Sequence, residues 1–315
     1  MKIISITMVK NEVDIIESFI RYHLKIFDEM IILDNGSTDE TVNIINKLIY
    51  EGLPLILIHD KDDIYNQYIK MSELLKKAVF EFNADIVCVL DADEFITNDK
   101  CNPREILEKL DSSFYYWVKW ITYVPTSNDN ESKFIPKRIK YIRDEHLERF
   151  YKVIVPKEIV LNYYVELTMG NHDLNIKNAD KRKLLKKLPT LKIAHYPLRS
   201  RDQCMSKVLV GWPNMISINL DDKPWGWHWQ IIFDKIKKDN CISDHDLENF
   251  AKYYAIKDYE NEIDLYYHPL NINFCEDINI KYNFNYNYLN NILDKYVSFA
   301  NEIKSLKKEL YLSKD

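Results

Sequence analysis

Two aspartates, Asp91 and Asp93, stand two positions apart directly after five apolar residues, 86–90. Carboxylates at this spacing can project into one cleft and hold a hard divalent cation through their oxygen atoms. Such a cation can bridge the oxygens of a diphosphate and stabilise the negative charge that develops as the diphosphate leaves. An isolated pair of this kind is more often a solvated acidic turn, so the neighbouring elements must decide between the two interpretations.

The elements that would position this pair alternate between strand and helix. Apolar runs typical of buried strands cover residues 3–8, 30–33, 54–59 and 86–90, and apolar residues at helical spacing recur over 13–27, 41–48 and 64–82. This repeated order predicts a parallel sheet with helices on both faces, and therefore an α/β fold.

Polar residues follow every one of these predicted strands. Asn11 and Glu12 come after the first strand, Asp34 after the second, Asp60 after the third and the aspartate pair after the last. Ligands of open α/β sheets bind beyond the carboxyl ends of the strands. Because the same register recurs after each strand, it favours a ligand site over a solvated turn.

Four segments in order carry a resemblance to a known family. They are Val9-Lys10-Asn11-Glu12, Phe19-Ile20-Arg21-Tyr22-His23, the residues 32–39 (Ile-Leu-Asp-Asn-Gly-Ser-Thr-Asp) and the residues 89–95 (Val-Leu-Asp-Ala-Asp-Glu-Phe). Over about the first 100 residues the chain resembles the glycosyltransferase family 2 superfamily. The resemblance implies a GT-A fold, with a Rossmann-like, mostly parallel sheet flanked by helices. It also implies inverting, metal-dependent transfer of a sugar from a nucleotide-diphosphate sugar to a hydroxyl acceptor.

The same resemblance implies roles for residues on the donor side. The residues that would lie around the nucleobase and the ribose are Asn11, Glu12, Asp39 and Asp60. Asp34 would close the nucleotide pocket. Asp93 would be the principal metal ligand, with Asp91 near the ribose and the metal. The family often has a helix containing glycine and arginine after the third strand, whereas this chain has Tyr-Asn-Gln-Tyr-Ile-Lys at 65–70. Donor contacts from that helix are therefore not predicted here.

His195 is the residue expected to complete the metal site. It lies within residues 193–200, a segment that resembles an element following the aspartate pair in the branch of the family whose first helix carries a motif like Phe19-Ile20-Arg21-Tyr22-His23. An imidazole beside two carboxylates suits Mn²⁺ better than Ca²⁺, so Mn²⁺ or Mg²⁺ is the predicted cofactor. A hydrogen-bonded core histidine at the end of a strand is the alternative interpretation.

Cationic residues of the second half are candidates to neutralise the leaving diphosphate. Arg199 would offer a bidentate fork, and Lys152 and Lys207 would each offer a point charge. Arg199 is therefore placed among the donor-binding residues. Each of the three is equally compatible with a position on the surface.

A base must take the proton of the acceptor hydroxyl in an inverting transfer. Glu166, His172 and Asp173 are candidates, and His172 and Asp173 are favoured because they stand beside the turn at Gly170. Aromatic strands predicted over 114–124 and 150–155 would frame this part of the molecule, with the polar loop 126–133 between them as an acceptor-facing flap.

An aromatic cluster later in the chain is a candidate acceptor wall. Trp225, Trp227 and His228 stand together with Trp229, and aromatic faces stack on the apolar faces of sugar rings. An acceptor of this kind would be a glycan, a lipid-linked saccharide or a protein, as in polysaccharide biosynthesis. A hydrophobic lid or the edge of a core explains the cluster equally well.

The remainder of the chain is predicted to be a helical extension. Apolar residues alternate in steps of three and four at positions 289, 292, 296, 299, 303, 306 and 310. This spacing indicates either a short coiled coil between two copies, and hence a homodimer, or a helix docked on its own domain. The expected organisation is a nucleotide-sugar-binding half over 1–110, an acceptor-binding half over 111–235 and a helical extension over 236–315.

Composition excludes several other classes. A formal net charge of −6 without a basic stripe argues against a nucleic-acid partner. The five cysteines lack a C-x-x-C pair, which argues against zinc and disulfides, and the five glycines cannot form a dinucleotide or P-loop motif. No leader or membrane-spanning run is predicted. We therefore expect a cytoplasmic protein whose contact with the inner face of the membrane, where there is any, is peripheral.

The leading hypothesis is a glycosyltransferase of the hexosyltransferase type. A catalytically inactive subunit that keeps the fold for binding is the alternative from another class, and both aspartates argue against it. Phosphatases with a D-x-D nucleophile place it after the first strand, and sugar nucleotidyltransferases need a glycine-rich loop that residues 5–12 lack. Both of these enzyme classes are disfavoured.

Overall fold

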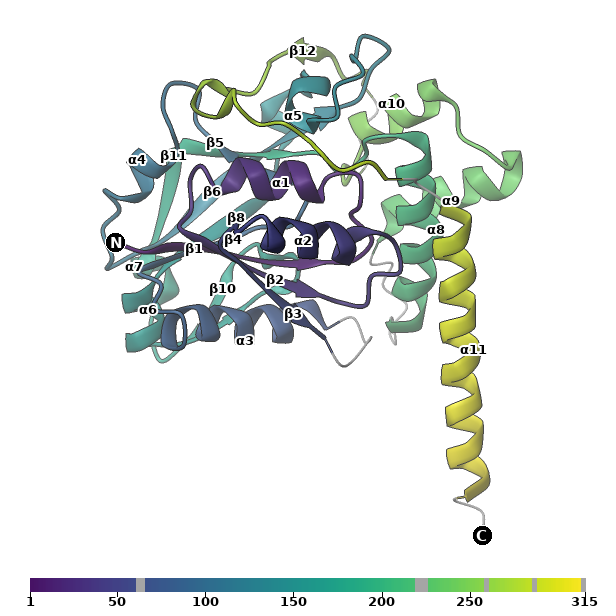
Figure 1. The fold of residues 1–315 in the computed structure, drawn as a ribbon, viewed down its shortest axis with the longest axis horizontal. Coiled ribbons are helices and arrows are strands. Elements are labelled where there is room, and N and C mark those ends of the chain that lie inside the picture. The colour runs from purple at the N-terminus through teal and green to yellow at the C-terminus, as the bar shows by residue number, and fades with distance from the viewer. Residues whose placement is uncertain (61–65, 219–225, 258–260, 285–287, 313–315) are drawn as a thin grey trace.

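The computed structural model describes residues 1–60, 66–218, 226–257, 261–284 and 288–312 (Figure 1). Its first strands are β1 (Ile3–Val9), β2 (Glu29–Asp34), β3 (Leu55–His59) and β4 (Ile86–Val89). β1 lies between β2 and β4, and β3 flanks β2, with all four strands parallel. The parallel arrangement predicted from the alternating sequence pattern is confirmed.

Helices cover both faces of these strands. They are α1 (Ile16–His23), α2 (Thr41–Tyr50) and α3 (Gln67–Phe80). Successive side chains of a strand point to opposite faces, so Ile3 packs in a buried cluster with residues of α1 and α2. Ile4 and Ile6 pack in a second cluster with Met71 and Leu75 of α3. The continuous apolar runs of the sequence are therefore strands that are buried on both faces.

The second half of the chain extends the same sheet. Its strands are β5 (Glu94–Thr97), β6 (Tyr115–Val124), β7 (Tyr141–Arg143), β8 (Tyr151–Pro156), β11 (Leu185–His195) and β12 (Leu265–Tyr267). β8 lies antiparallel between β4 and β6, while β11 runs parallel to β6 and antiparallel to β5. The path β12-β7-β6-β8-β4-β1-β2-β3 is thus mixed. The predicted α/β class is confirmed, as are the strands expected near 114–124 and 150–155.

Helix α1 fixes β5, which follows the aspartate pair directly. The Tyr22 hydroxyl donates to the carbonyl of Ile96 at 2.9 Å, and the N–H of Ile96 donates to Nε2 of His23 at 3.3 Å. His23 is fully buried and its ring stacks with those of Phe27 and Phe95. These contacts tie the backbone that follows Asp93 to the body of the molecule.

The helices after β11 pack beside the carboxyl ends of the parallel strands. They are α8 (Arg201–Ile218), α9 (Trp227–Asp239), α10 (Asp244–Lys252) and α11 (Tyr288–Leu312). The smaller elements are α4 (Arg104–Leu107), α5 (Ile135–Arg138), α6 (Lys157–Asn162), α7 (Lys181–Leu184) and the paired strands β9 (Tyr164–Leu167) and β10 (Leu174–Lys177). Among the described helices, none has the length and apolar character that crossing a membrane would require.

Helix α11 begins against α8 and then leaves the body of the molecule (Figure 1). Near its start, the buried side chain of Asn291 donates to the Ser206 hydroxyl at 2.9 Å. The region predicted as helical beyond residue 236 also contains β12. It further contains a segment in which the N–H groups of Lys281 and Tyr282 donate to the Glu17 carboxylate at 2.9 Å.

Candidate functional site

A cavity of about 720 Å³ opens beyond the carboxyl ends of β1 and β4, within the range of roughly 300–1,000 Å³ typical of small-molecule sites. At the strand ends, the polar residues that line the cavity include Asn11, Glu12, Asn35, Asp91 and Asp93. Helices α8 and α9 contribute lining residues that include Lys207, Trp227 and His228. Of the residues expected to converge, those after β1 and β4 line the cavity, whereas after β2 it is Asn35 and not the predicted Asp34 that does. Asp60, after β3, is not among the lining residues, and its carboxylate pairs with Lys70.

Two loops at the edge of the cavity are joined by their own polar side chains. Asn11 has a φ of 57°, and its side-chain oxygen accepts the N–H of Thr38 at 2.8 Å. The Asp39 carboxylate accepts the N–H groups of Val13 and Thr41, and burial raises its pKa. Asp34 accepts the N–H of Ser37 at 3.1 Å. Neither Asp34 nor Asp39 lines the cavity, so both brace the loops that shape it.

The carboxylate of Asp91 is surrounded by donors. Lys152 Nζ lies 2.5 Å from Oδ2, and the Asn171 and Gln67 amides donate to Oδ1 at 3.2 and 3.4 Å. Lys152 is buried and also lies 3.3 Å from Glu94 Oε1. Burial opposes the charged form of Lys152, but Asp91 and Glu94 outweigh burial and raise its pKa. Asp91 is therefore neutralised by a lysine at the floor of the site.

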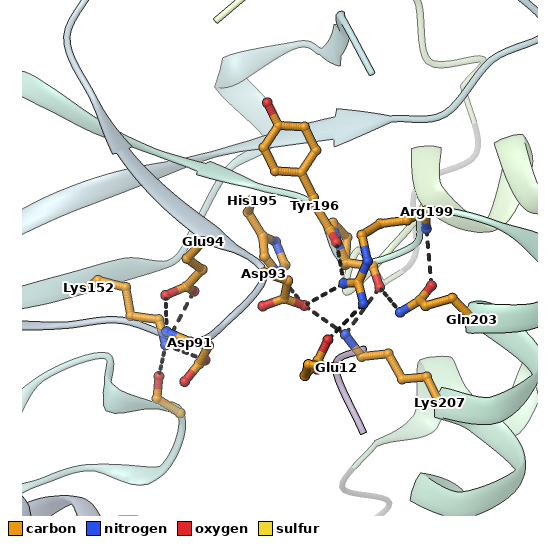
Figure 2. Close-up of polar contacts among 12 residues, drawn as sticks. Glu12, Asp91, Asp93, Glu94, Lys152, His195, Tyr196, Arg199, Gln203 and Lys207 are labelled. Carbon is orange, nitrogen blue, oxygen red and sulfur yellow. Dashed lines mark hydrogen bonds and ion pairs between the residues drawn. The ribbon is translucent and has the colours of Figure 1, made fainter. Parts of the chain in front are cut away.

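The carboxylate of Asp93 faces a different set of partners (Figure 2). Lys207 Nζ lies 2.8 Å from its Oδ2, His195 Nε2 lies 3.8 Å away, and Arg199 Nη1 lies 3.9 Å away. Burial works against ionisation of Asp93, but the nearby charges, Lys207 foremost, hold its pKa below the usual range. The Asp93 carboxylate therefore stays ionised, because the ammonium group of Lys207 balances its negative charge.

These residues do not fit a cation shared by Asp91, Asp93 and His195. Figure 2 shows Lys152 beside Asp91 and Lys207 beside Asp93, on separate sides of the site. Within the described part of the chain, no three His, Cys, Asp or Glu side chains are grouped so that they could hold a metal ion. The His195 ring instead stacks on Trp120 at a centroid distance of 4.0 Å. The predicted metal ligands are thus close in the fold without forming a common ligand set.

Arg199 is fully buried and uses its whole guanidinium inside the protein. Nε and Nη2 donate to Asp14 at 2.7 and 2.8 Å, Nη2 donates to Glu12 at 2.7 Å, and Nη1 donates to the carbonyl of Tyr196 at 3.1 Å. It does not line the cavity, so it positions the loop after β1. Burial, opposed by Arg199, raises the pKa of Glu12 to about 7.

His172, but not Asp173, lines the cavity. The Nδ1 of His172 lies 2.9 Å from the carbonyl of Tyr151, and burial lowers its pKa to about 4. Gly170 has a φ of 74°, and a Cβ there would lie 2.5 Å from His172 Nε2, so the turn that places His172 requires glycine. The Asp173 carboxylate accepts from Tyr115 and Trp117 and pairs with Lys181.

The described part of the aromatic cluster belongs to the cavity wall. Trp227 and His228 line it, and burial lowers the pKa of His228 to about 4. Trp225 lies outside the described residues. Sequence reasoning missed Trp120, which lines the cavity between the rings of His172 and His195. The aromatic strand predicted over 114–124 contained it, but no spacing rule singled it out.

Comparison with solved structures returns chains of low sequence identity and low structural similarity. The crystal structure of S. aureus TarS 1–349 shares 14% identity, with 82% of this chain and 76% of that chain covered and a TM-score of 0.39. GalNAc-T7 with UDP, GalNAc and Mn²⁺ shares 11% identity, with 81% of this chain and 56% of that chain covered and a TM-score of 0.41. Mannosyltransferase PcManGT from Pyrobaculum calidifontis, with GDP-Man and Mn²⁺, shares 13% identity, covering 80% and 72%, with a TM-score of 0.37.

Sequence comparison addresses the family directly. None of the curated proteins matches the chain in sequence. The sequence model of the family described as Glycosyl transferase family 2 matches residues 5–152, a range that includes all four motif segments and both aspartates of the site. The N-terminal half of the chain is therefore similar to Glycosyl transferase family 2, and the sheet topology is that of an α/β fold.

Proposed function

We propose that this protein transfers a sugar, in the manner of a hexosyltransferase, from a nucleotide-diphosphate sugar to a hydroxyl group of a glycan, a lipid-linked saccharide or a protein. The observation that carries the proposal is the cavity of about 720 Å³ at the strand ends, which Asp91 and Asp93 line. Both aspartates lie inside the segment matched to the family, which supports a donor site beside them. The halves 1–110 and 111–235 would bind the donor and the acceptor.

The nucleotide part of the donor would lie against the loops after β1 and β2. Asn11, Glu12 and Asn35 line that side of the cavity, and buried contacts hold both loops in place. The diphosphate would then lie toward Asp93 and Lys207. The sequence predicts a requirement for Mn²⁺ or Mg²⁺. The ion pairs of Asp91 with Lys152 and of Asp93 with Lys207 do not support that part of the prediction.

His172 is the proposed base of an inverting transfer. A neutral ring whose Nδ1–H donates to the Tyr151 carbonyl keeps Nε2 as the acceptor of a proton. The acceptor hydroxyl would transfer its proton to Nε2 while its oxygen attacks the anomeric carbon from the face opposite the diphosphate. Trp227 and His228, which also line the cavity, would hold the acceptor. Asp173 serves this proposal less well because its carboxylate is fully engaged.

A homodimer through α11 is a further part of the proposal. Tyr296, Ile303 and Leu306 occupy positions of the predicted coiled-coil spacing and are each more than half exposed. The end of α11 that carries them projects from the body (Figure 1). A second copy of the same helix would cover this stripe.

Donor hydrolysis by the full chain tests the proposed activity. A panel of nucleotide sugars is incubated with the wild type, with Asp93→Asn and with Asp111→Asn, an exposed surface control. At least one donor is expected to be turned over, with no loss in the control. A loss of about 100-fold is expected in Asp93→Asn, because the carboxylate that holds Lys207 is removed and the loss of one well-placed donor to the leaving diphosphate costs this order of rate. Binding of donors without turnover would favour the inactive binding subunit, and the absence of both would overturn the proposal.

A further inference from the structure

Lys207 occupies the place on Asp93 that a bridging cation would need. Its Nζ lies 2.8 Å from Asp93 Oδ2 and 3.1 Å from the carbonyl of Pro197. The side chain is 20% exposed and lines the cavity. The ammonium group is therefore held in a defined position while one side of it remains open to a ligand.

Lys152 neutralises the second aspartate from below. It does not line the cavity, and its Nζ is bonded to Asp91 Oδ2 at 2.5 Å and to the carbonyl of Gly170 at 2.8 Å. Because Asp91 already carries this buried cation, its carboxylate offers little attraction to a further ion. Lys152 is a positioning residue here, since it reaches the cavity only through Asp91.

Each aspartate of the site is paired with its own cation, while the other carboxylates on these cations, Glu12 and Glu94, are buried and have raised pKa values. The cations Lys152, Lys207 and Arg199 face the carboxylates of Asp91, Asp93 and Asp14. A divalent ion on Asp93 would have to displace Lys207 or stand beside its ammonium, and like charges at such short range repel strongly in a partly buried site. Together the two lysines supply the two positive charges that a divalent ion would bring.

We propose that Lys207, supported by Lys152, takes the role of the metal ion, so that the donor is cleaved without an added divalent cation. The proposal rests on the proposed function. In the reaction the bond between the anomeric carbon and the diphosphate oxygen breaks, and its electron pair stays on that oxygen, where Lys207 stabilises the charge. The acceptor oxygen forms the new bond to the anomeric carbon, and its proton goes to His172. The nucleoside diphosphate then leaves.

Binding of nucleoside diphosphates tests the proposal independently of turnover. UDP and GDP are titrated calorimetrically into the wild type, Lys207→Met, Lys207→Arg and the control Lys235→Met, with EDTA or with Mn²⁺. Lys235 pairs with Asp239 on α9, away from the cavity. We expect one diphosphate to bind the wild type and the control equally well in EDTA and in Mn²⁺. Lys207→Met should bind it at least about 10-fold more weakly, the scale of one lost charge-assisted contact, and Lys207→Arg should retain binding.

The corresponding nucleoside separates loss of the diphosphate contact from misfolding. Uridine or guanosine should bind Lys207→Met as it binds the wild type. Donor turnover should persist in EDTA and fall by about 100-fold in Lys207→Met. Binding and turnover that vanish in EDTA and return with Mn²⁺ or Mg²⁺ would overturn this proposal and leave the proposed function standing. If no diphosphate binds and no donor is cleaved under either condition, both fail.

Discussion

Arg199 shows how one buried side chain can organise a site that it does not touch. Its guanidinium joins Glu12 and Asp14, in the loop after β1, to the segment after β11. Asp14 is 185 residues away in sequence. Because the fork is fully buried and bidentate, replacing it leaves two carboxylates without a partner.

Replacement of Arg199 by leucine is therefore expected to lower the free energy of unfolding by about 3–5 kcal/mol, the cost of breaking a buried pair. Urea unfolding measures this loss. Arg201→Leu is the matched control, because Arg201 is 56% exposed and pairs at the surface with Asp244, which is worth about 0–1 kcal/mol. Equal losses in the two variants would show that Arg199 does not hold the loop.

At the scale of elements, the contact between α1 and β5 holds the residues that follow the aspartate pair. His23 suits this contact only as a neutral ring, in which Nδ1–H donates to the Phe19 carbonyl and Nε2 accepts the N–H of Ile96. Burial lowers its pKa from 6.5 to about 3. A proton on Nε2 would face the N–H of Ile96 and break the contact.

The fold should therefore lose stability in acid through His23. The unfolded chain binds the proton at about pH 6.5 and the folded chain only near pH 3. The contribution of His23 is thus complete above pH 6.5 and declines below it, by up to about 1.4 kcal/mol per pH unit. Urea unfolding at about pH 7.5 and at about pH 5 measures how much free energy of unfolding is lost between the two pH values. This loss should be about 2 kcal/mol smaller in His23→Gln than in the wild type. The exposed control His146→Gln should lose as much stability in acid as the wild type. If His23→Gln also loses as much as the wild type, His23 is not the group that makes the fold sensitive to acid.

The whole molecule combines a sheet that builds the cavity with a helix that projects beyond it. The first turns of α11 pack on α8 through Asn291 and Ser206, so they belong to the body. The later residues Ile303 and Leu306 are 53% and 59% exposed. The docked-helix interpretation of the heptad spacing therefore describes the first turns of α11, and the coiled-coil interpretation is proposed for the projecting end alone.

Light scattering tests the dimer proposed for this projecting end. The full chain is expected at twice the chain mass, whereas a chain ending at residue 300, which keeps the contact with α8, is expected at the chain mass. The double variant Ile303→Lys, Leu306→Lys should also be monomeric, because charges at these positions disrupt a coiled-coil seam. A chain ending at residue 312 is the control and should remain dimeric. A monomeric full chain would exclude the dimer.

The sequence alone determined the α/β class, the parallel order of the first four strands and the position of Asp91 and Asp93 at the end of the last of them. Periodicity and turn residues are local signals, and the carboxyl ends of parallel strands meet at one edge of a sheet whatever follows in the chain. The family motifs lie in the same part of the chain, so the prediction of a donor site at this edge rests on local sequence alone.

Only the tertiary structure decided how these residues are partnered. The pairs Lys152–Asp91 and Lys207–Asp93 join residues 61 and 114 positions apart, and no local pattern encodes contacts over such separations. Folding also turned His172 toward the cavity and Asp173 away from it, although the two are neighbours in sequence. The aspartates could be found from the sequence because they follow a strand. Their lysine partners became visible only in the fold, because an ion pair depends on where the antiparallel strand β8 and the helix α8 bring their side chains.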